Sequence, residues 1–193
     1  MPASFNHIAV LVVVLNAIGL GTLMIGNANF LRTPAKTATK SSGVLIAWLL
    51  FHVYLHVMLW WRFFGLQLVK SFTFFDYLFM LFGPMCLLFG SALLLPDEEE
   101  GAIDMPAYLD RIHRRFFSLE TAFWIWALLF APLMTAKWEA AWQSFAAMAA
   151  ISLILAVSRS QVLRIALTGA AWLVQLIFVT TDALLLRAVP LSG

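Results

Sequence analysis

The sequence predicts an all-α, polytopic integral membrane protein, with six transmembrane helices in one bundle and residues 1–193 forming a single transmembrane domain. Two observations lead to this prediction. Hydrophobic residues make up 63% of the chain and charged residues 11%, whereas soluble domains are about 45–50% apolar and about 25% charged. Apolar segments of about 20 residues, the length that spans a bilayer, also recur along the chain. A soluble core of this size could not bury so much apolar surface.

Local features separate the apolar segments from one another. Residues 32–42, RTPAKTATKSS, are polar and contain a proline that a continuing helix would not tolerate. Gly65 and the polar residues up to Ser71 separate the second segment from the third. The six predicted spans are residues 7–31, 43–64, 72–95, 116–136, 140–158 and 163–187.

The largest polar stretch is residues 96–115, PDEEEGAIDMPAYLDRIHRR. Its proline ends the third helix, and its acidic run is expected to lie in water. Residues 106–115 are expected to form a separate interfacial helix, with Tyr108, Leu109 and Ile112 facing the membrane.

The distribution of Lys and Arg predicts the orientation, because cytoplasmic loops are enriched in these residues. The first, third and fifth loops together carry eight basic residues, and the other side carries four. We therefore expect these three loops in the cytoplasm and both termini outside the membrane.

Polar residues inside the predicted spans fall on helical stripes. Trp48, His52, His56 and Trp60 are spaced four apart, so they share one face of the second helix. Such stripes usually face the interior of a bundle, because lipid cannot satisfy their hydrogen bonds. Two further stripes are Asn16 with Asn27 on the first helix, and Thr168, Gln175 and Asp182 on the sixth.

The predicted helix directions place His56, Asp76 and Asp182 in the outer half of the membrane, where they could share one site. Glu120 lies near the cytoplasmic start of the fourth span, close to the arginines at 114–115. We expect this carboxylate to form an ion pair or to interact with the helix N-terminus.

The pair His52-x-x-x-His56 leaves three interpretations open. Neutral imidazoles four residues apart could hold a zinc-like divalent metal, with Asp76 or Asp182 completing the ligand set. The same residues could relay or sense protons or cations, because histidine titrates near neutral pH and ionisable residues within spans are usually functional. The third interpretation is that the histidines only bond neighbouring helices and pack against the tryptophans of their stripe.

Three stretches resemble a loose family of uncharacterised small bacterial six-helix inner-membrane proteins. They are NAIGLGTLMIG in the first helix, AWLLFHVYLHVMLWW in the second and LLLPDEEEGAIDMPAYLDRIHRRFF between the third and fourth. The resemblance covers about the first 120 residues. It implies the six-helix topology and a bacterial inner membrane, and it implies no catalytic residue.

Three classes of function follow from the sequence. The first is a small cation or proton pathway or sensor built around the intramembrane His and Asp residues. The alternatives are a structural or accessory membrane subunit and a metal-dependent intramembrane enzyme. The sequence favours a protein that is not an enzyme, because it contains no recognisable nucleophile or nucleotide-binding motif. The expected partners are the lipid bilayer and a second copy or a larger membrane complex, and a net charge of +2 argues against nucleic acid.

Overall fold

The computed structural model describes residues 3–32, 38–40, 42–63, 73–96, 103–135, 138 and 141–183. Six α-helices account for nearly all of them, which confirms the all-α prediction. A short π-helical turn, η2 (Val179–Ala183), continues the last helix. The helices are α1 (Ala3–Arg32), α2 (Gly43–Phe63), α3 (Phe74–Leu94), α4 (Met105–Thr135), α5 (Trp142–Val157) and α6 (Gln161–Phe178).

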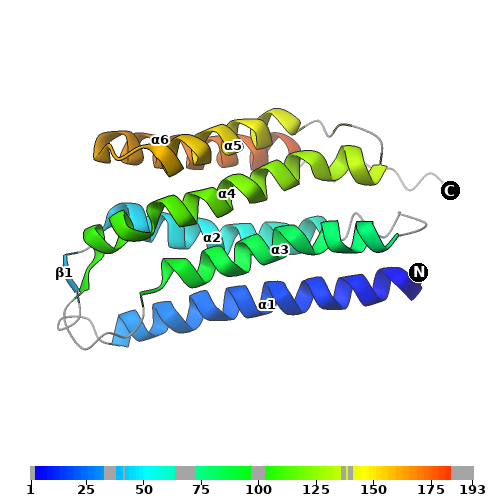
Figure 1. Ribbon diagram of the computed structural model, residues 1–193, viewed down its shortest axis with the longest axis horizontal. Helices are drawn as coiled ribbons and strands as arrows, with labels where there is room; N and C mark the ends of the chain where they lie inside the picture. The colour runs from blue at the N-terminus through cyan, green and yellow to red at the C-terminus, as the bar shows by residue number, and fades with distance from the viewer. Residues whose placement is uncertain are drawn as a thin grey trace.

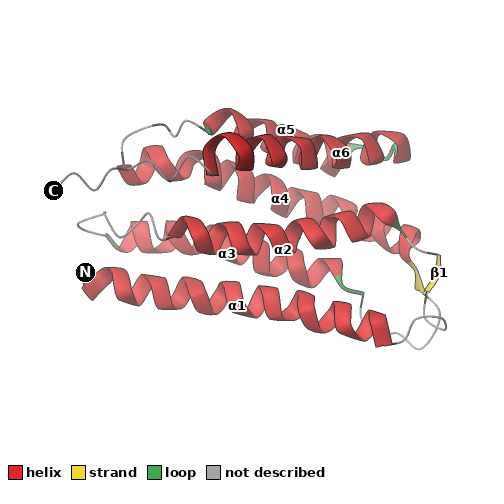
Figure 2. Cartoon of the chain, turned by 180° about the vertical axis from the view of Figure 1, so that it is seen from behind, coloured by secondary structure: helices red, strands yellow, loops and turns green. Residues whose placement is uncertain are grey.

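The helices lie lengthwise beside one another, with α1 at one edge and α5 and α6 at the opposite edge (Figures 1 and 2). The α1 helix packs against α3 and α2, α4 packs against α3 and α5, and α6 packs against α5 and α2. The second helix therefore has neighbours on several sides, and its side chains meet residues from most of the bundle.

Five of the helices, α1, α2, α3, α4 and α6, are long and apolar enough to cross a membrane. The fifth, α5, is equally apolar but has only 16 residues. The predicted bounds of the second, third and fifth spans agree with the structure to within two residues at each end.

Two short parallel strands hold the first and third loops together at one end of the molecule. They are β1 (Ala38–Lys40) and β2 (Ile103–Asp104), and their backbones pair Ala38 with Ile103. Figure 1 shows β1 at the end opposite the N-terminus, and the turn between α5 and α6 lies at the same end as β1. The first, third and fifth loops therefore share one end of the bundle.

The structure corrects the prediction for residues 106–115. They do not form a separate interfacial helix but are the first turns of a continuous α4 of 31 residues. The Asp104 carboxylate accepts a hydrogen bond from the Ala107 N–H at the start of the helix, and Pro106 lies in the first turn, where a missing N–H does no harm.

The face of these turns that was expected to meet lipid is instead buried in protein. Leu109 and Ile112 belong to the core. The Tyr108 hydroxyl, at 2.8 Å from the Leu93 carbonyl oxygen and 2.9 Å from that of Leu95, reaches the C-terminal end of α3. These carbonyls would otherwise lack helical partners, so α4 caps α3 as well as packing beside it.

Candidate functional site

His52 and His56 are the centre of the most extensive polar network among the described residues. They are four residues apart on α2, and both are fully buried, at 0% exposure. Their ring centroids lie 6.4 Å apart. Because residues at this spacing share one helical face, both imidazoles can contact the same residue of a neighbouring helix.

Glu120 is the partner of His52. Its Oε1 lies 2.5 Å from His52 Nε2, and both side chains are almost completely buried. The Trp124 Nε1–H donates to the other carboxylate oxygen, Oε2, at 3.2 Å. The expected ion pair with the arginines at 114–115 is therefore wrong. Glu120 lies midway along α4 rather than at its start, and Arg114 and Arg115 are exposed.

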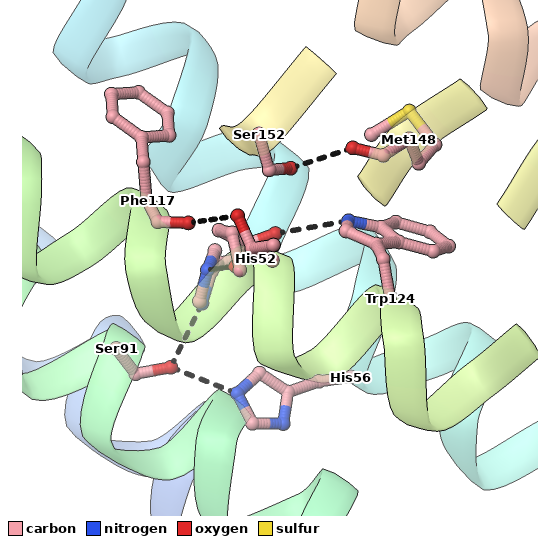
Figure 3. A network of polar contacts seen from close by, with 9 residues as sticks. His52, His56, Ser91, Phe117, Trp124, Met148 and Ser152 are labelled. Carbon is pink, nitrogen blue, oxygen red and sulfur yellow. Dashed lines mark hydrogen bonds and ion pairs between the residues drawn. The ribbon is translucent and has the colours of Figure 1, made fainter. Parts of the chain in front are cut away.

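Ser91 joins the two histidines from α3. Its Oγ lies 3.3 Å from His52 Nδ1 and 2.9 Å from His56 Nε2. Figure 3 shows the serine hydroxyl between the two rings, in contact with both. Ser91 is fully buried, so no bulk water competes for these contacts.

Asn16, on α1, fixes the direction of the hydrogen bonds. Its Nδ2 donates to the His56 carbonyl oxygen at 3.0 Å, so its Oδ1 must be the atom 2.7 Å from His56 Nδ1. An amide oxygen only accepts, which means that His56 carries a proton on Nδ1. In the neutral ring Nε2 is then an acceptor, and the Ser91 O–H donates to it.

The same reasoning determines how His52 is protonated. Because the Ser91 hydroxyl donates to His56, its oxygen accepts from His52 Nδ1–H. With Nδ1 protonated, one further proton lies between His52 Nε2 and Glu120 Oε1. It gives either a carboxylic acid bonded to a neutral imidazole or a carboxylate bonded to an imidazolium.

Two glycines bring the neighbouring helices close to the imidazoles. A Cβ atom at Gly90 of α3 would lie 2.6 Å from His52 Cε1, and one at Gly19 of α1 would overlap His56 Cε1. Both contacts would be shorter than the van der Waals distance, so any residue larger than glycine would displace the neighbouring imidazole ring. The absence of side chains at these two positions lets α1 and α3 approach the histidines closely enough for Asn16 and Ser91 to reach them.

The structure brings together the two predicted histidines but does not place Asp76 beside them. Asp76 lies in the first turn of α3, where its carboxylate accepts from the Thr73 N–H at 2.7 Å in a capping box. Ser91 lies in the last turn, and at about 1.5 Å per residue it is roughly 22 Å from Asp76 along the helix axis. Asp182 lies in η2, and its side chain is outside the described residues.

The stripe predicted on α6 does face α2. The Trp48 Nε1–H donates to Thr168 Oγ1 at 3.0 Å, and the Tyr54 hydroxyl donates to Gln175 Oε1 at 3.1 Å. Trp60, the last member of the stripe on α2, is 45% exposed. The inward-facing part of that stripe therefore ends at His56.

No group of three or more His, Cys, Asp or Glu side chains placed to hold a metal ion occurs within the described part of the chain. The zinc-like site at His52, His56, Asp76 and Asp182 stays a prediction. In the structure the four ring nitrogens of the two histidines contact Glu120, Ser91 and Asn16.

Comparisons of the chain with known protein families, with characterised proteins and with solved structures find no match. Conclusions about function therefore depend on the geometry of the network. Sequence reasoning did not identify Ser91, or Glu120 as the partner of His52. A usable signal for Glu120 was the spacing of Tyr108, Ile112 and Phe116, which continues the apolar face of the fourth helix upstream.

Proposed function

We propose that the chain is a six-span inner-membrane protein that binds and releases a proton at the buried pair His52–Glu120 and so responds to pH. The short contact between His52 Nε2 and Glu120 Oε1 is the observation that supports this proposal most directly. Neutral amides or hydroxyls would suffice to hold two helices together. Ionisable residues are costly inside a membrane and usually have a function there.

The distribution of exposed side chains supports insertion in a membrane. One end of the bundle, where α2 ends and α3 begins, carries exposed aromatic residues, which favour the membrane interface. The opposite end carries exposed arginines, which favour the cytoplasmic side. The aromatic residues are Trp60, Trp61, Phe74, Phe75, Trp138 and Trp142, and the arginines are Arg111, Arg114, Arg115 and Arg159.

The length of α5 is compatible with a sixth span. At about 1.5 Å per residue, its 16 residues extend roughly 24 Å, whereas the hydrocarbon core is about 30 Å thick. Trp138 and Trp142 pack together at its N-terminal end, and Arg159 follows its C-terminal end. These interfacial residues allow a short helix to cross with local thinning of the bilayer.

The hydrogen-bond network favours a proton-binding sensor over a proton-conducting pathway. Conduction requires groups that can both accept and release a proton along the whole path. The network ends at Asn16, and an amide does not release a proton at neutral pH. A proton bound at His52–Glu120 is therefore held within this network.

Infrared spectroscopy of the purified protein in lipid nanodiscs tests the proposal. A pH titration of the wild type is expected to show a protonated carboxyl band that appears and disappears, and the Glu120→Gln variant is expected to lack it. Asp110→Asn removes an exposed carboxylate from the same helix and serves as the control, because it should leave the band unchanged. A titration in which Glu120→Gln and the wild type give the same carboxyl signal would contradict the proposal.

Two further measurements distinguish the alternatives. Proton flux into proteoliposomes that is abolished by replacing both His52 and His56 with Gln would indicate a pathway instead of a sensor. Stoichiometric metal in the purified protein, lost in the same double variant, would indicate the metal-dependent enzyme. We expect neither flux nor bound metal from the arrangement of the network.

A further inference from the structure

The pair His52–Glu120 accounts for only half of the network, and Ser91, His56 and Asn16 form the other half. We infer that Ser91 transfers a proton from the His52–Glu120 pair to His56, so that the site holds its proton at either of two positions. This inference rests on the proposed function, because it specifies how the same proton moves after it is bound.

When the proton is on Glu120, the hydrogen bonds of the relay run in one direction. From Glu120 they pass to His52 Nε2, then from His52 Nδ1–H to the Ser91 oxygen, from the Ser91 O–H to His56 Nε2, and from His56 Nδ1–H to Asn16. A chain in which each group is both donor and acceptor can transfer a proton by breaking and forming one bond at each step. His52, Ser91 and His56 meet this condition.

The transfer balances without any further reactant. The Glu120 O–H bond breaks as a bond forms between the proton and His52 Nε2. The His52 Nδ1–H bond breaks as a new O–H bond forms on Ser91, and the original Ser91 proton passes to His56 Nε2. The products are a Glu120 carboxylate, neutral His52 with its proton on Nε2, an unchanged serine hydroxyl and a His56 imidazolium.

The groups that face this relay come from four helices. His52 and His56 are on α2, Glu120 on α4 and Ser91 on α3, and α1 contributes the neutral amide of Asn16. The Cys86 thiol of α3 also interacts with Glu120. Since the Asn16 amide oxygen accepts from His56 Nδ1 and the amide has no proton to pass on at neutral pH, the transfer stops there.

The position of the proton changes how strongly α1 is held. The His56 imidazolium donates to Asn16 Oδ1, and a hydrogen bond from a charged donor is roughly twice as strong as one between neutral groups. Because α1 packs against α2 and α3, the state of the Glu120 carboxyl is transmitted to the contact between α1 and α2. The relay therefore links a protonation event on α4 to α1.

Parallel titrations of Glu120 and His56 in nanodiscs test the relay. The Glu120 carboxyl is followed by infrared spectroscopy, and His56 by ¹⁵N NMR of histidine-labelled protein, with His56→Gln used for assignment. In the wild type we expect the carboxyl band and the His56 imidazolium signal to weaken together over one pH range as the pH rises, because a single proton is distributed between the two positions. In Ser91→Ala we expect this coincidence to be lost, since no hydroxyl connects the rings.

Ser152→Ala is the matched control. Ser152 is also fully buried, but its hydroxyl donates to the Met148 carbonyl oxygen within α5 (Figure 3), so the two titrations should still coincide. Should Ser91→Ala not fold, Ser91→Cys keeps a side chain of similar size with a weaker hydrogen bond and should separate the two titrations in the same direction.

The results of these titrations distinguish a failure of the relay from a failure of the proposed function. Coincident titrations in Ser91→Ala or Ser91→Cys, unchanged from the wild type, would overturn the relay and leave the proton site at His52–Glu120 intact. A wild type without any Glu120 carboxyl titration would overturn both.

Discussion

The α2 helix makes polar contacts on two faces, and the two faces differ in what they can do. Toward α6, Trp48 and Tyr54 each donate one hydrogen bond, to Thr168 and Gln175. Toward α1, α3 and α4, His52 and His56 take part in a connected series of bonds that includes a carboxyl group. Both faces hold helices together, but among these contacts only those of the second face include a carboxyl group and imidazoles, which can bind and release protons.

This comparison shows that buried polarity alone does not mark a functional site in a membrane bundle. A neutral contact such as Tyr54–Gln175 has one donor and one acceptor and the same state at every physiological pH. Interhelical hydrogen bonds of this kind contribute roughly 0.6 kcal/mol on average. The histidine face differs because it contains ionisable groups and because the tautomer of each histidine depends on the hydrogen bond made by its neighbour.

Removal of the Glu120 carboxylate should have the largest effect. Glu120→Met keeps the length of the side chain but leaves His52 Nε2 and the Trp124 N–H without partners. Each unsatisfied buried group costs about 1–3 kcal/mol. On the opposite face, Tyr54→Phe should cost only about 0.6 kcal/mol. The free energy of unfolding in mixed micelles measures the loss of stability in each variant. Equal losses in the two variants would mean that the two faces of α2 contribute equally to stability.

Filling the glycine positions beside the imidazoles should have the next largest effect. Gly90→Ala and Gly19→Ala place a methyl group against rings that hydrogen bonds hold on both sides, and such overpacking costs about 1–3 kcal/mol. Both variants should also shift the ¹⁵N signals of His52 and His56.

Two other glycines are matched controls for these variants. A Cβ atom at Gly21 or Gly169 would meet no atom within 4 Å, so Gly21→Ala and Gly169→Ala should be neutral or stabilising by about 0.5–1 kcal/mol. If Gly90→Ala matched these controls in thermal unfolding, close approach of α3 to His52 would not be required.

The smallest effect is expected on the α6 side. A double-mutant cycle with Trp48→Phe and Thr168→Val isolates the hydrogen bond between them from the loss of ring volume. We expect a coupling of about 0.6 kcal/mol that does not vary with pH. A corresponding cycle with His52→Gln and Glu120→Gln should give a coupling that varies with pH, and a constant value there would remove the contrast between the two faces.

The helices and part of the site could be predicted from the sequence, because apolar runs of membrane-spanning length and four-residue spacing are local signals. They indicated α2 and α3 nearly to the residue, and they placed His52, His56, Thr168 and Gln175 on inward faces. Spacing along one helix cannot show which residue of another helix lies opposite, so Asp76 was assigned to a site that contains Glu120 instead.

The predicted ion pair of Glu120 was wrong for a physical reason. The arginines at 114–115 suggested a membrane boundary, and a carboxylate a few residues beyond it suggested an ion pair with them. In the structure α4 begins at Met105 and carries these arginines on an exposed face, while Glu120 points into the bundle. Ser91 gave no signal, because a single serine in an apolar helix is common and its importance depends on two rings from another helix.

The amide of Asn16 has a consequence for the energy balance of a cell. A membrane that stores a proton gradient loses energy through every continuous chain of exchangeable groups that crosses it. Here the chain of histidines and serine is closed by a side chain that accepts a hydrogen bond and passes nothing on. Replacing that one residue by an aspartate would extend the exchangeable chain to α1, so in the proposed function Asn16 ends the proton path as well as binding His56.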